Sequence, residues 1–171
     1  MNSPLSLLLL GFLTIAAASN EARIANHCGK APHREPRETL LVPASKWASV
    51  SGTIELPPIK GGDDHYRVMC SEGCTYTFSF CSRGGSCDFD SGLSIWNQDL
   101  TGQLGCNMNL CGLGSELTWT APADGIFHLR IGGLPEGVGR YTLGYGMSDA
   151  TCGSAPVHDA NWSLVKRLFR E

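Results

Sequence analysis

The sequence predicts an all-β protein, an antiparallel β-sandwich of about seven or eight strands stapled by disulfides and followed by a short C-terminal helix. Three observations predict this class. Short segments alternate between apolar and polar residues with a period of two, and turn residues separate them. The 171 residues include 21 glycines and 9 prolines, which is too turn-rich for a helical bundle. Eight cysteines are typical of an exported domain that disulfides stabilise.

The N-terminal segment has the features of a signal peptide, which we assign to residues 1–18. Residues 5–18 form an almost uninterrupted apolar run, long enough for export but short for a membrane span, and the alanines at 16–18 suit a cleavage site. An uncleaved buried helix is the alternative. No second apolar run approaches the length of a span, so we expect a secreted chain that crosses no membrane. Residues 19–39 are polar and contain two prolines, which indicates a linker.

The predicted sandwich domain spans residues 40–152. Its clearest strand is residues 74–81, in which Tyr76, Phe78 and Phe80 alternate with small polar residues. The same alternation predicts further strands at residues 49–56, 66–70, 92–97, 116–120, 126–131 and 141–145. Clusters of glycine, proline and aspartate between these segments supply the turns. The side chains expected to share one core are Phe78, Phe80, Leu117, Trp119, Phe127 and Leu129.

The C-terminal segment, residues 153–171, differs from the sandwich. It begins with a linker-like Gly-Ser-Ala-Pro stretch, and residues 159–170 then fit an amphipathic helix. Trp162, Val165 and Phe169 would share its apolar side, while basic residues lie near its C-terminal end. Such a short helix is marginal alone, so it either docks on the sandwich or engages a partner or an anionic surface.

The cysteines favour disulfides over zinc, because an export signal precedes them and most of their spacings do not match those of structural zinc sites. Only the gap between Cys106 and Cys111 fits such a site, and no pair of histidines follows it. Their even number leads us to expect that all eight are oxidised. Eight cysteines allow many pairings, and spacing alone cannot choose among them. The simplest arrangement has three local bridges and one long tie. It pairs Cys70 with Cys74, Cys81 with Cys87, Cys106 with Cys111, and Cys28 with Cys152.

Residues 66–145, about 80 of the 171, carry a series of short motifs. These are Tyr76 to Phe78, Asp90 to Trp96, Cys106 to Gly112, Ser115 to Ala121, Asp124 to Ile131 and Gly139 to Leu143. Through them the chain resembles the bacterial pre-peptidase C-terminal domain family, in its cysteine-containing form, and the related collagen-binding domains of collagenases. The resemblance implies a jelly-roll-like sandwich and a role beside secreted proteases, where some members help to bind substrate. The sequence departs from that pattern in containing no protease domain.

Calcium is the one cofactor whose ligands the sequence can supply, because calcium prefers hard oxygen atoms. The candidate ligands are Asp63, Asp64, Asp88 and Asp90, with Asp99, Asn107 and Asn109 of suitable type. No calcium-loop spacing joins these residues, and solvated turns explain the carboxylates equally well. We therefore expect no cofactor, with calcium as the alternative.

Two further features concern binding and catalysis. Trp96 has the opposite parity to Leu93 and Ile95, so we expect it on the surface as a binding residue. The five histidines are scattered, and the sequence contains neither a zinc-protease nor a serine-hydrolase motif, so no catalytic residue is identified. The net charge of −3 offers no basic excess for nucleic-acid binding.

These observations lead to three hypotheses for a chain that we expect to be a monomer. The first is a secreted, non-catalytic binding or adhesion module that recognises an extracellular protein or polysaccharide surface. The second is an accessory or inhibitory domain for a secreted protease. The third is a hydrolase with an unrecognised site, which a close group of histidines and carboxylates in one cleft would favour.

Overall fold

The computed structural model describes residues 28, 32, 35–43, 46–55, 63–133, 137–148 and 152. The predicted signal peptide lies outside the described residues, as does the predicted helix with Trp162, Val165 and Phe169. Within the part of the chain that the structure describes, no helix is long and apolar enough to cross a bilayer.

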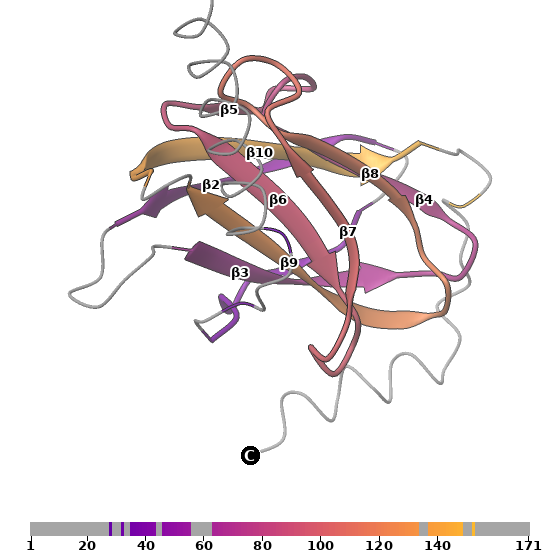
Figure 1. The fold of residues 1–171 in the computed structure, drawn as a ribbon. Coiled ribbons are helices and arrows are strands. Elements are labelled where there is room, and N and C mark those ends of the chain that lie inside the picture. The colour runs from indigo at the N-terminus through magenta and orange to yellow at the C-terminus, as the bar shows by residue number, and fades with distance from the viewer. Residues whose placement is uncertain are drawn as a thin grey trace, which may run out of the picture.

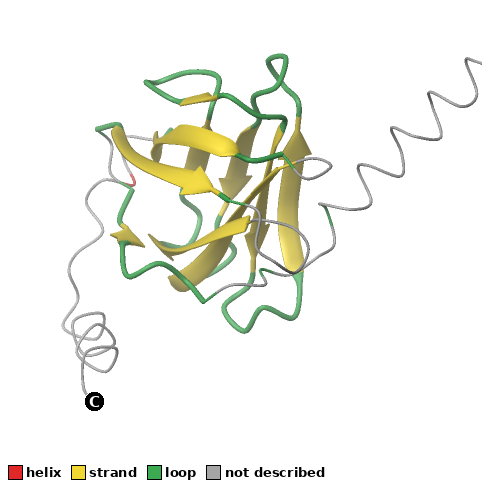
Figure 2. Ribbon diagram, turned by 90° about the vertical axis from the view of Figure 1, so that its left-hand side faces the viewer, coloured by secondary structure: helices red, strands yellow, loops and turns green. Residues whose placement is uncertain are grey.

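Ten strands of the described chain form two sheets that pack face to face, as predicted for a β-sandwich (Figure 1, Figure 2). Sheet A has the order β1 (Leu40–Leu41), β3 (Asp63–Cys70), β9 (Gly125–Gly133), β6 (Ser91–Trp96) and β7 (Gln103–Met108). Sheet B has the order β2 (Ala48–Ile54), β10 (Gly139–Met147), β4 (Thr75–Ser79) and β8 (Glu116–Thr120), and β5 (Ser86–Cys87) also pairs with β10. All strand pairs are antiparallel except β1 with β3.

All seven predicted strands are present, with ends that shift by up to three residues. Strands β1, β5 and β7 were not predicted from the sequence. The first two are only two residues long. In β7, Leu104, Cys106 and Met108 do alternate with polar or small residues, but the strand contains no β-branched or aromatic residue and its side chains are only partly buried or exposed. Residues 60–64 are one of the clusters of glycine and aspartate expected to form turns, but Asp63 and Asp64 are already the first residues of β3.

The core lies between the sheets and contains the side chains that the alternation selected. Phe78, Phe80, Leu117, Phe127 and Leu129 are all buried in one cluster, which confirms the predicted core face. Trp119 packs against this cluster while remaining partly exposed, and its ring lies edge-on to Phe127 at 5.0 Å between centroids. Each buried side chain of this size stabilises the fold by roughly 1.5–3 kcal/mol relative to its exposed state.

The disulfides differ from every predicted pair. The structure joins Cys28 to Cys106, Cys74 to Cys152, and Cys81 to Cys111, and it leaves Cys70 and Cys87 as free thiols. The expectation that all eight cysteines are oxidised is therefore also wrong. Each bridge spans 30 or 78 residues of sequence rather than the few residues of a local staple.

The failure of the local pairs has a geometric cause in the sandwich. Cys70 is the last residue of β3 in sheet A, whereas Cys74 lies just before β4 in sheet B. The chain therefore crosses from one sheet to the other between these two cysteines. Cys70 is 4% exposed, and its burial raises the pKa of its thiol. A disulfide needs facing side chains, which closeness in sequence does not ensure.

Two residues of the predicted linker are attached to the sandwich. Cys28 is bonded to Cys106 of β7. The backbone amide of Arg37 donates to the carbonyl oxygen of His65 in β3 at 2.7 Å. The N-terminal segment is thus held to sheet A at both points.

Candidate binding site

A groove of about 600 Å³, open to solvent, lies on sheet B where β2 and β5 flank β10. The pairing register places Thr142 between Ser51 of β2 and Ser86 of β5. Because side chains alternate between the two faces of a strand, these three hydroxyls share the outer face. The lining residues are Ser51, Gly52, Thr53, Ser86, Cys87, Asp88, Arg140, Tyr141 and Thr142.

Hydroxyl groups form the floor of this groove. The Ser51 and Thr142 side-chain oxygens are 3.0 Å apart in an exposed hydrogen bond. A hydroxyl can donate once and accept twice, so this bond leaves both side chains able to hydrogen-bond to a ligand. Gly52 pairs with Tyr141 across the two strands, and a Cβ at position 52 would collide with the Tyr141 side chain. Glycine at position 52 therefore lets the tyrosine pack directly beneath the groove.

Tyr141 anchors the floor to a buried polar network. Its hydroxyl donates to the Asp64 carboxylate at 2.5 Å, and the Tyr66 hydroxyl lies 2.8 Å away. Since Tyr141 has a single proton to donate, Tyr66 is the donor in the second bond. The Arg37 guanidinium completes the network with a 2.6 Å ion pair to Asp64.

The protonation states in this network follow from its contacts. Burial, and next the hydrogen bond to Asp64, raise the pKa of Tyr141 well above its ordinary value. The hydrogen bond to the same carboxylate raises the pKa of Arg37. Both phenols are therefore neutral and the guanidinium is charged at any physiological pH. The tyrosine below the groove is a structural support and not a proton donor to a ligand.

The loop between β4 and β5 bounds the groove on sheet B. Gly144 is the next outward-facing residue of β10 after Thr142, and a Cβ there would press against the carbonyl oxygens of Ser82 and Arg83. The loop backbone thus covers the strand directly beyond the groove. The Arg83 guanidinium lies 4.9 Å from the Trp47 ring centroid, which gives a cation–π contact on top of this loop.

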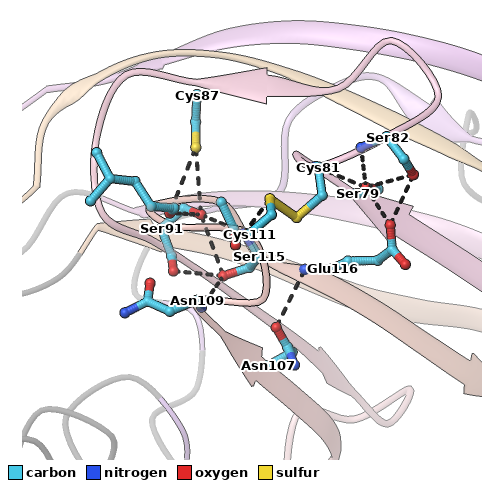
Figure 3. The surroundings of a disulfide bond; sticks show 12 residues. Ser79, Cys81, Ser82, Cys87, Ser91, Asn107, Asn109, Cys111, Ser115 and Glu116 are labelled. Carbon is cyan, nitrogen blue, oxygen red and sulfur yellow. Dashed lines mark hydrogen bonds between the residues drawn. A yellow bond between two sulfur atoms is a disulfide. The ribbon is translucent and has the colours of Figure 1, made fainter.

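Side-chain hydrogen bonds hold this loop in place (Figure 3). The buried Ser79 hydroxyl accepts from the amides of Cys81 and Ser82, both at 2.9 Å. It donates in turn to the Glu116 carboxylate of β8 at 2.7 Å. The Ser82 hydroxyl donates to the same carboxylate oxygen at 2.9 Å. One carboxylate therefore ties the start of the loop to the neighbouring strand.

The disulfide of Cys81 with Cys111 joins this loop to the one between β7 and β8 (Figure 3). Behind it, the Ser91 amide and hydroxyl both donate to the Leu113 carbonyl oxygen at 2.9 Å. The Ser115 hydroxyl donates to the Ser91 carbonyl oxygen at 2.6 Å. The Cys87 thiol donates weakly to the Leu113 carbonyl oxygen at 3.8 Å and lies 3.6 Å from the Ser91 hydroxyl, so the groove wall formed by residues 86–88 contacts this hydrogen-bonded loop.

The tip of the second loop carries two exposed apolar side chains. Leu110 is 60% exposed and Leu113 is 53% exposed. The backbone between them is fixed by a positive φ of 72° at Gly112 and by hydrogen bonds between residues 110–111 and Gly114. We call this pair, Leu110 and Leu113, the apolar knob. It lies beside the groove, because the Leu113 carbonyl oxygen is 3.8 Å from the thiol of the lining residue Cys87. Exposed apolar surface is often found where proteins contact a partner.

The calcium candidates are not brought together. Asp63 forms a buried ion pair with Arg130, and Asp64 belongs to the tyrosine network on the opposite face of β3. Asp88 accepts a hydrogen bond from the Arg140 amide at 2.7 Å in the groove, and one carboxylate oxygen of Asp90 is buried. Within the described ranges, no group of three or more His, Cys, Asp or Glu residues is arranged to hold a metal ion.

Trp96 lies on the outer face of sheet A, as its parity predicts, but the expected exposure is wrong. The side chain is 5% exposed, and its indole nitrogen donates to the Ser94 hydroxyl at 3.0 Å. A tryptophan covered in this way offers no free ring to a ligand. The sequence pattern identified the face but gave no information on what covers it.

Two of the five scattered histidines meet on that same face. His65 Nε2 and His128 Nδ1 are 2.7 Å apart, and His128 Nε2 lies 3.2 Å from the Gln98 carbonyl oxygen. The carbonyl can only accept, so His128 carries its proton on Nε2 and accepts from His65. Burial, and next the neighbouring histidine, lower the pKa of His128. Because His65 is 2% exposed, the pair does not form an open acid–base site.

The groove is lined by polar side chains. Its lining residues include five hydroxyls, one free thiol, one carboxylate and one guanidinium, but no histidine. The Ser51 hydroxyl bonds to another hydroxyl and not to a base that could activate it as a nucleophile. None of these hydroxyls was predicted from the sequence as part of a site. The one available signal was the alternation of Ser49, Ser51 and Thr53, which marks a polar outer face without marking a site.

Comparison with known proteins gives likenesses of fold alone. No protein-family model matches the chain, and no curated protein sequence matches it. One similar solved structure is the pre-peptidase C-terminal domain of a collagenase from Bacillus anthracis, with a TM-score of 0.48 and 12% identity over 67% of this chain and 99% of that one. Another is PliG of Aeromonas hydrophila, a periplasmic inhibitor of g-type lysozyme, with a TM-score of 0.43 and 13% identity over 64% of this chain and 97% of that one. The first belongs to the family that residues 66–145 resemble.

Proposed function

We propose that this chain is a secreted, non-catalytic binding module that recognises an extracellular protein or polysaccharide surface through the groove on sheet B. The observation that carries this proposal is a solvent-open groove whose lining residues are held in place by buried hydrogen bonds and by neighbouring loops. The floor rests on the Tyr141 network, and the wall contacts, through the Cys87 thiol, the loop that the disulfide of Cys81 with Cys111 joins. Side chains that are already ordered lose little conformational entropy when a ligand binds.

The supporting chemistry is the absence of activated groups among the lining residues. A hydrolytic site needs a nucleophile or an activated water held by a group that titrates near the working pH. The groove instead offers a hydroxyl pair, the Cys87 thiol, which has no histidine beside it among the lining residues, and a carboxylate, Asp88, that already accepts a backbone hydrogen bond. These groups suit recognition, in which the ligand leaves chemically unchanged.

A blocking variant tests this proposal. Ser51→Trp places a large ring in the groove from an exposed position on β2. Thr120→Trp is the matched control, because Thr120 is also exposed on the same sheet but lies on β8, at the opposite edge. We expect the wild-type chain and the control to be retained on native extracellular matrix or cell-envelope material, and the blocking variant to be lost. Equal retention of all three proteins would contradict binding through the groove.

The apolar knob supports a second candidate function, an accessory or inhibitory role toward a secreted protease. Leu110 and Leu113 project from a disulfide-fixed loop, which is the kind of rigid protrusion that enters an enzyme cleft at low entropic cost. The test is the activity of secreted proteases with and without the chain. Under this alternative, the double variant Leu110→Asp and Leu113→Asp loses its effect on the protease while Ser51→Trp retains it.

A further inference from the structure

We propose that the ligand of the groove on sheet B is an uncharged polysaccharide chain, which contacts the groove mainly through hydroxyl-to-hydroxyl hydrogen bonds. This inference rests on the proposed function and names the class of ligand for the same site. It is drawn from the hydrogen-bonding groups, the charge and the strand pairing of the groove.

The hydrogen-bonding groups are the first argument. Side-chain hydroxyls enter the groove from all three strands: Ser51 and Thr53 from β2, Thr142 from β10, and Ser86 from β5. Each can both donate and accept, as can every hydroxyl of a sugar ring. A chain with hydroxyls on both edges can therefore pair with this floor in several registers. Ligands that only donate or only accept would use half of its capacity.

The charge of the groove is the second argument. The lining includes one carboxylate, Asp88, and one guanidinium, Arg140, so it is balanced overall. The Asp88 carboxylate already accepts a hydrogen bond from the Arg140 backbone amide. An anionic polysaccharide or a phosphate-bearing ligand would need an excess of positive charge that the lining does not have. An uncharged chain meets no such requirement.

The strand pairing is the third argument: β10, the central strand of the groove, has no free edge to which an extended peptide could add, although β2 is an edge strand of sheet B. Peptides add to sheets through the free backbone groups of an edge strand. At the groove, β10 is paired on both sides, since Tyr141 faces Gly52 of β2 and Cys87 of β5. Its backbone hydrogen bonds are therefore used within the sheet. The lining residues include no aliphatic side chain that would pack against an apolar side chain of a peptide.

The sole aromatic ring of the lining belongs to Tyr141, which is 3% exposed. Sugar rings often stack on exposed aromatic faces, and this groove provides none among its lining residues. Affinity must then come from hydrogen bonds along several sugar units. We expect weak binding of a single sugar and stronger binding of a chain.

Affinity electrophoresis of the full exported chain provides the test. Native gels contain one of a panel of neutral polysaccharides (a soluble β-glucan, a galactomannan, a mannan and dextran), or alginate as the anionic probe, or gelatin as the protein probe. The groove variant is the double substitution Ser51→Ala and Thr142→Val. The matched control is Thr75→Val and Thr120→Val, which removes an equally exposed hydroxyl pair, 2.8 Å apart, on the same face of sheet B. Melting temperatures of all proteins are compared so that a folding defect is recognised.

We expect at least one neutral polysaccharide to retard the wild-type chain and the control, with a dissociation constant that changes less than about twofold between low and high salt because no charges pair. The groove variant should bind about tenfold more weakly, since two hydrogen bonds to the ligand are lost. Retardation by gelatin alone, abolished in the groove variant, would overturn the polysaccharide inference and leave the proposed binding function standing. Retardation by alginate that salt removes would overturn the inference as well. Binding by none of the probes would also contradict it, and the retention experiment with Ser51→Trp then decides the proposed function separately.

Discussion

Removing the disulfide of Cys81 with Cys111 tests two effects of this bridge separately: its contribution to the free energy of unfolding and its effect on binding through the groove. This bridge closes a loop of 30 residues. In the chain-entropy model, a loop of that length stabilises the folded state by about 3.6 kcal/mol relative to the open chain. The double variant Cys81→Ala and Cys111→Ala avoids new free thiols and leaves the serine hydrogen bonds around the two loops in place.

Urea unfolding under non-reducing conditions measures the change in free energy. The matched comparison is Cys74→Ala with Cys152→Ala, which opens a 78-residue loop and should cost about 4.5 kcal/mol by the same model. If the groove wall depends on the shorter bridge, only the first variant also loses retention on the extracellular material. A loss below about 1 kcal/mol for the first variant, or equal retention by both variants, would refute this reasoning.

Three further outcomes follow from the buried groups. Tyr141→Phe removes the donor to Asp64, so it should lower the free energy of unfolding by about 2–4 kcal/mol in urea titration; a loss under about 0.5 kcal/mol would mean that the bond contributes little. The pKa of His128 is lowered in the folded chain, so as the pH falls below about 6.5, the ordinary histidine pKa, the unfolded chain binds a proton before the folded chain does. The free energy of unfolding should therefore be greatest above that pH and decrease below it by up to about 1.4 kcal/mol per pH unit. The variant His128→Gln should remove this pH dependence, and an unchanged dependence would contradict the assignment. Alkylation of the non-reduced chain should label two cysteines: half-buried Cys87 in the native state, and buried Cys70 only after unfolding. If no cysteine is labelled after unfolding, the assignment of Cys70 and Cys87 as free thiols is contradicted.

The fold was largely predictable because sheet formation follows a local pattern. Alternation over residues 74–81 placed Phe78 in the core, and the same rule located six other strands. Of the strands that were not predicted, β7 forms a hairpin with its neighbour β6, whereas β1 and β5 depend on partners distant in sequence. β5 exists because Ser86 and Cys87 meet β10, more than fifty residues away, and two residues carry no period of their own.

The site was largely unpredictable, because its groups come together only through tertiary pairing. Ser51 and Thr142 are 91 residues apart, and nothing in either segment indicates that their hydroxyls meet. The predicted disulfide pairing was wrong for the same reason, since the bridge of Cys81 with Cys111 depends on which loops the sandwich brings together. Trp96 shows the complementary limit, because parity predicts the face of a strand but not what covers that face.

The measurement that tests the central claim most directly is backbone amide hydrogen exchange of the chain, free and bound to the extracellular material that retains it. Binding through the groove excludes water from the strands and the wall that line it, so exchange should slow at residues 51–53, 86–88 and 140–142. Residues 75–77 of the same sheet serve as the internal reference and should not change. Slower exchange confined to residues 110–113, or no difference at the groove, would contradict the account.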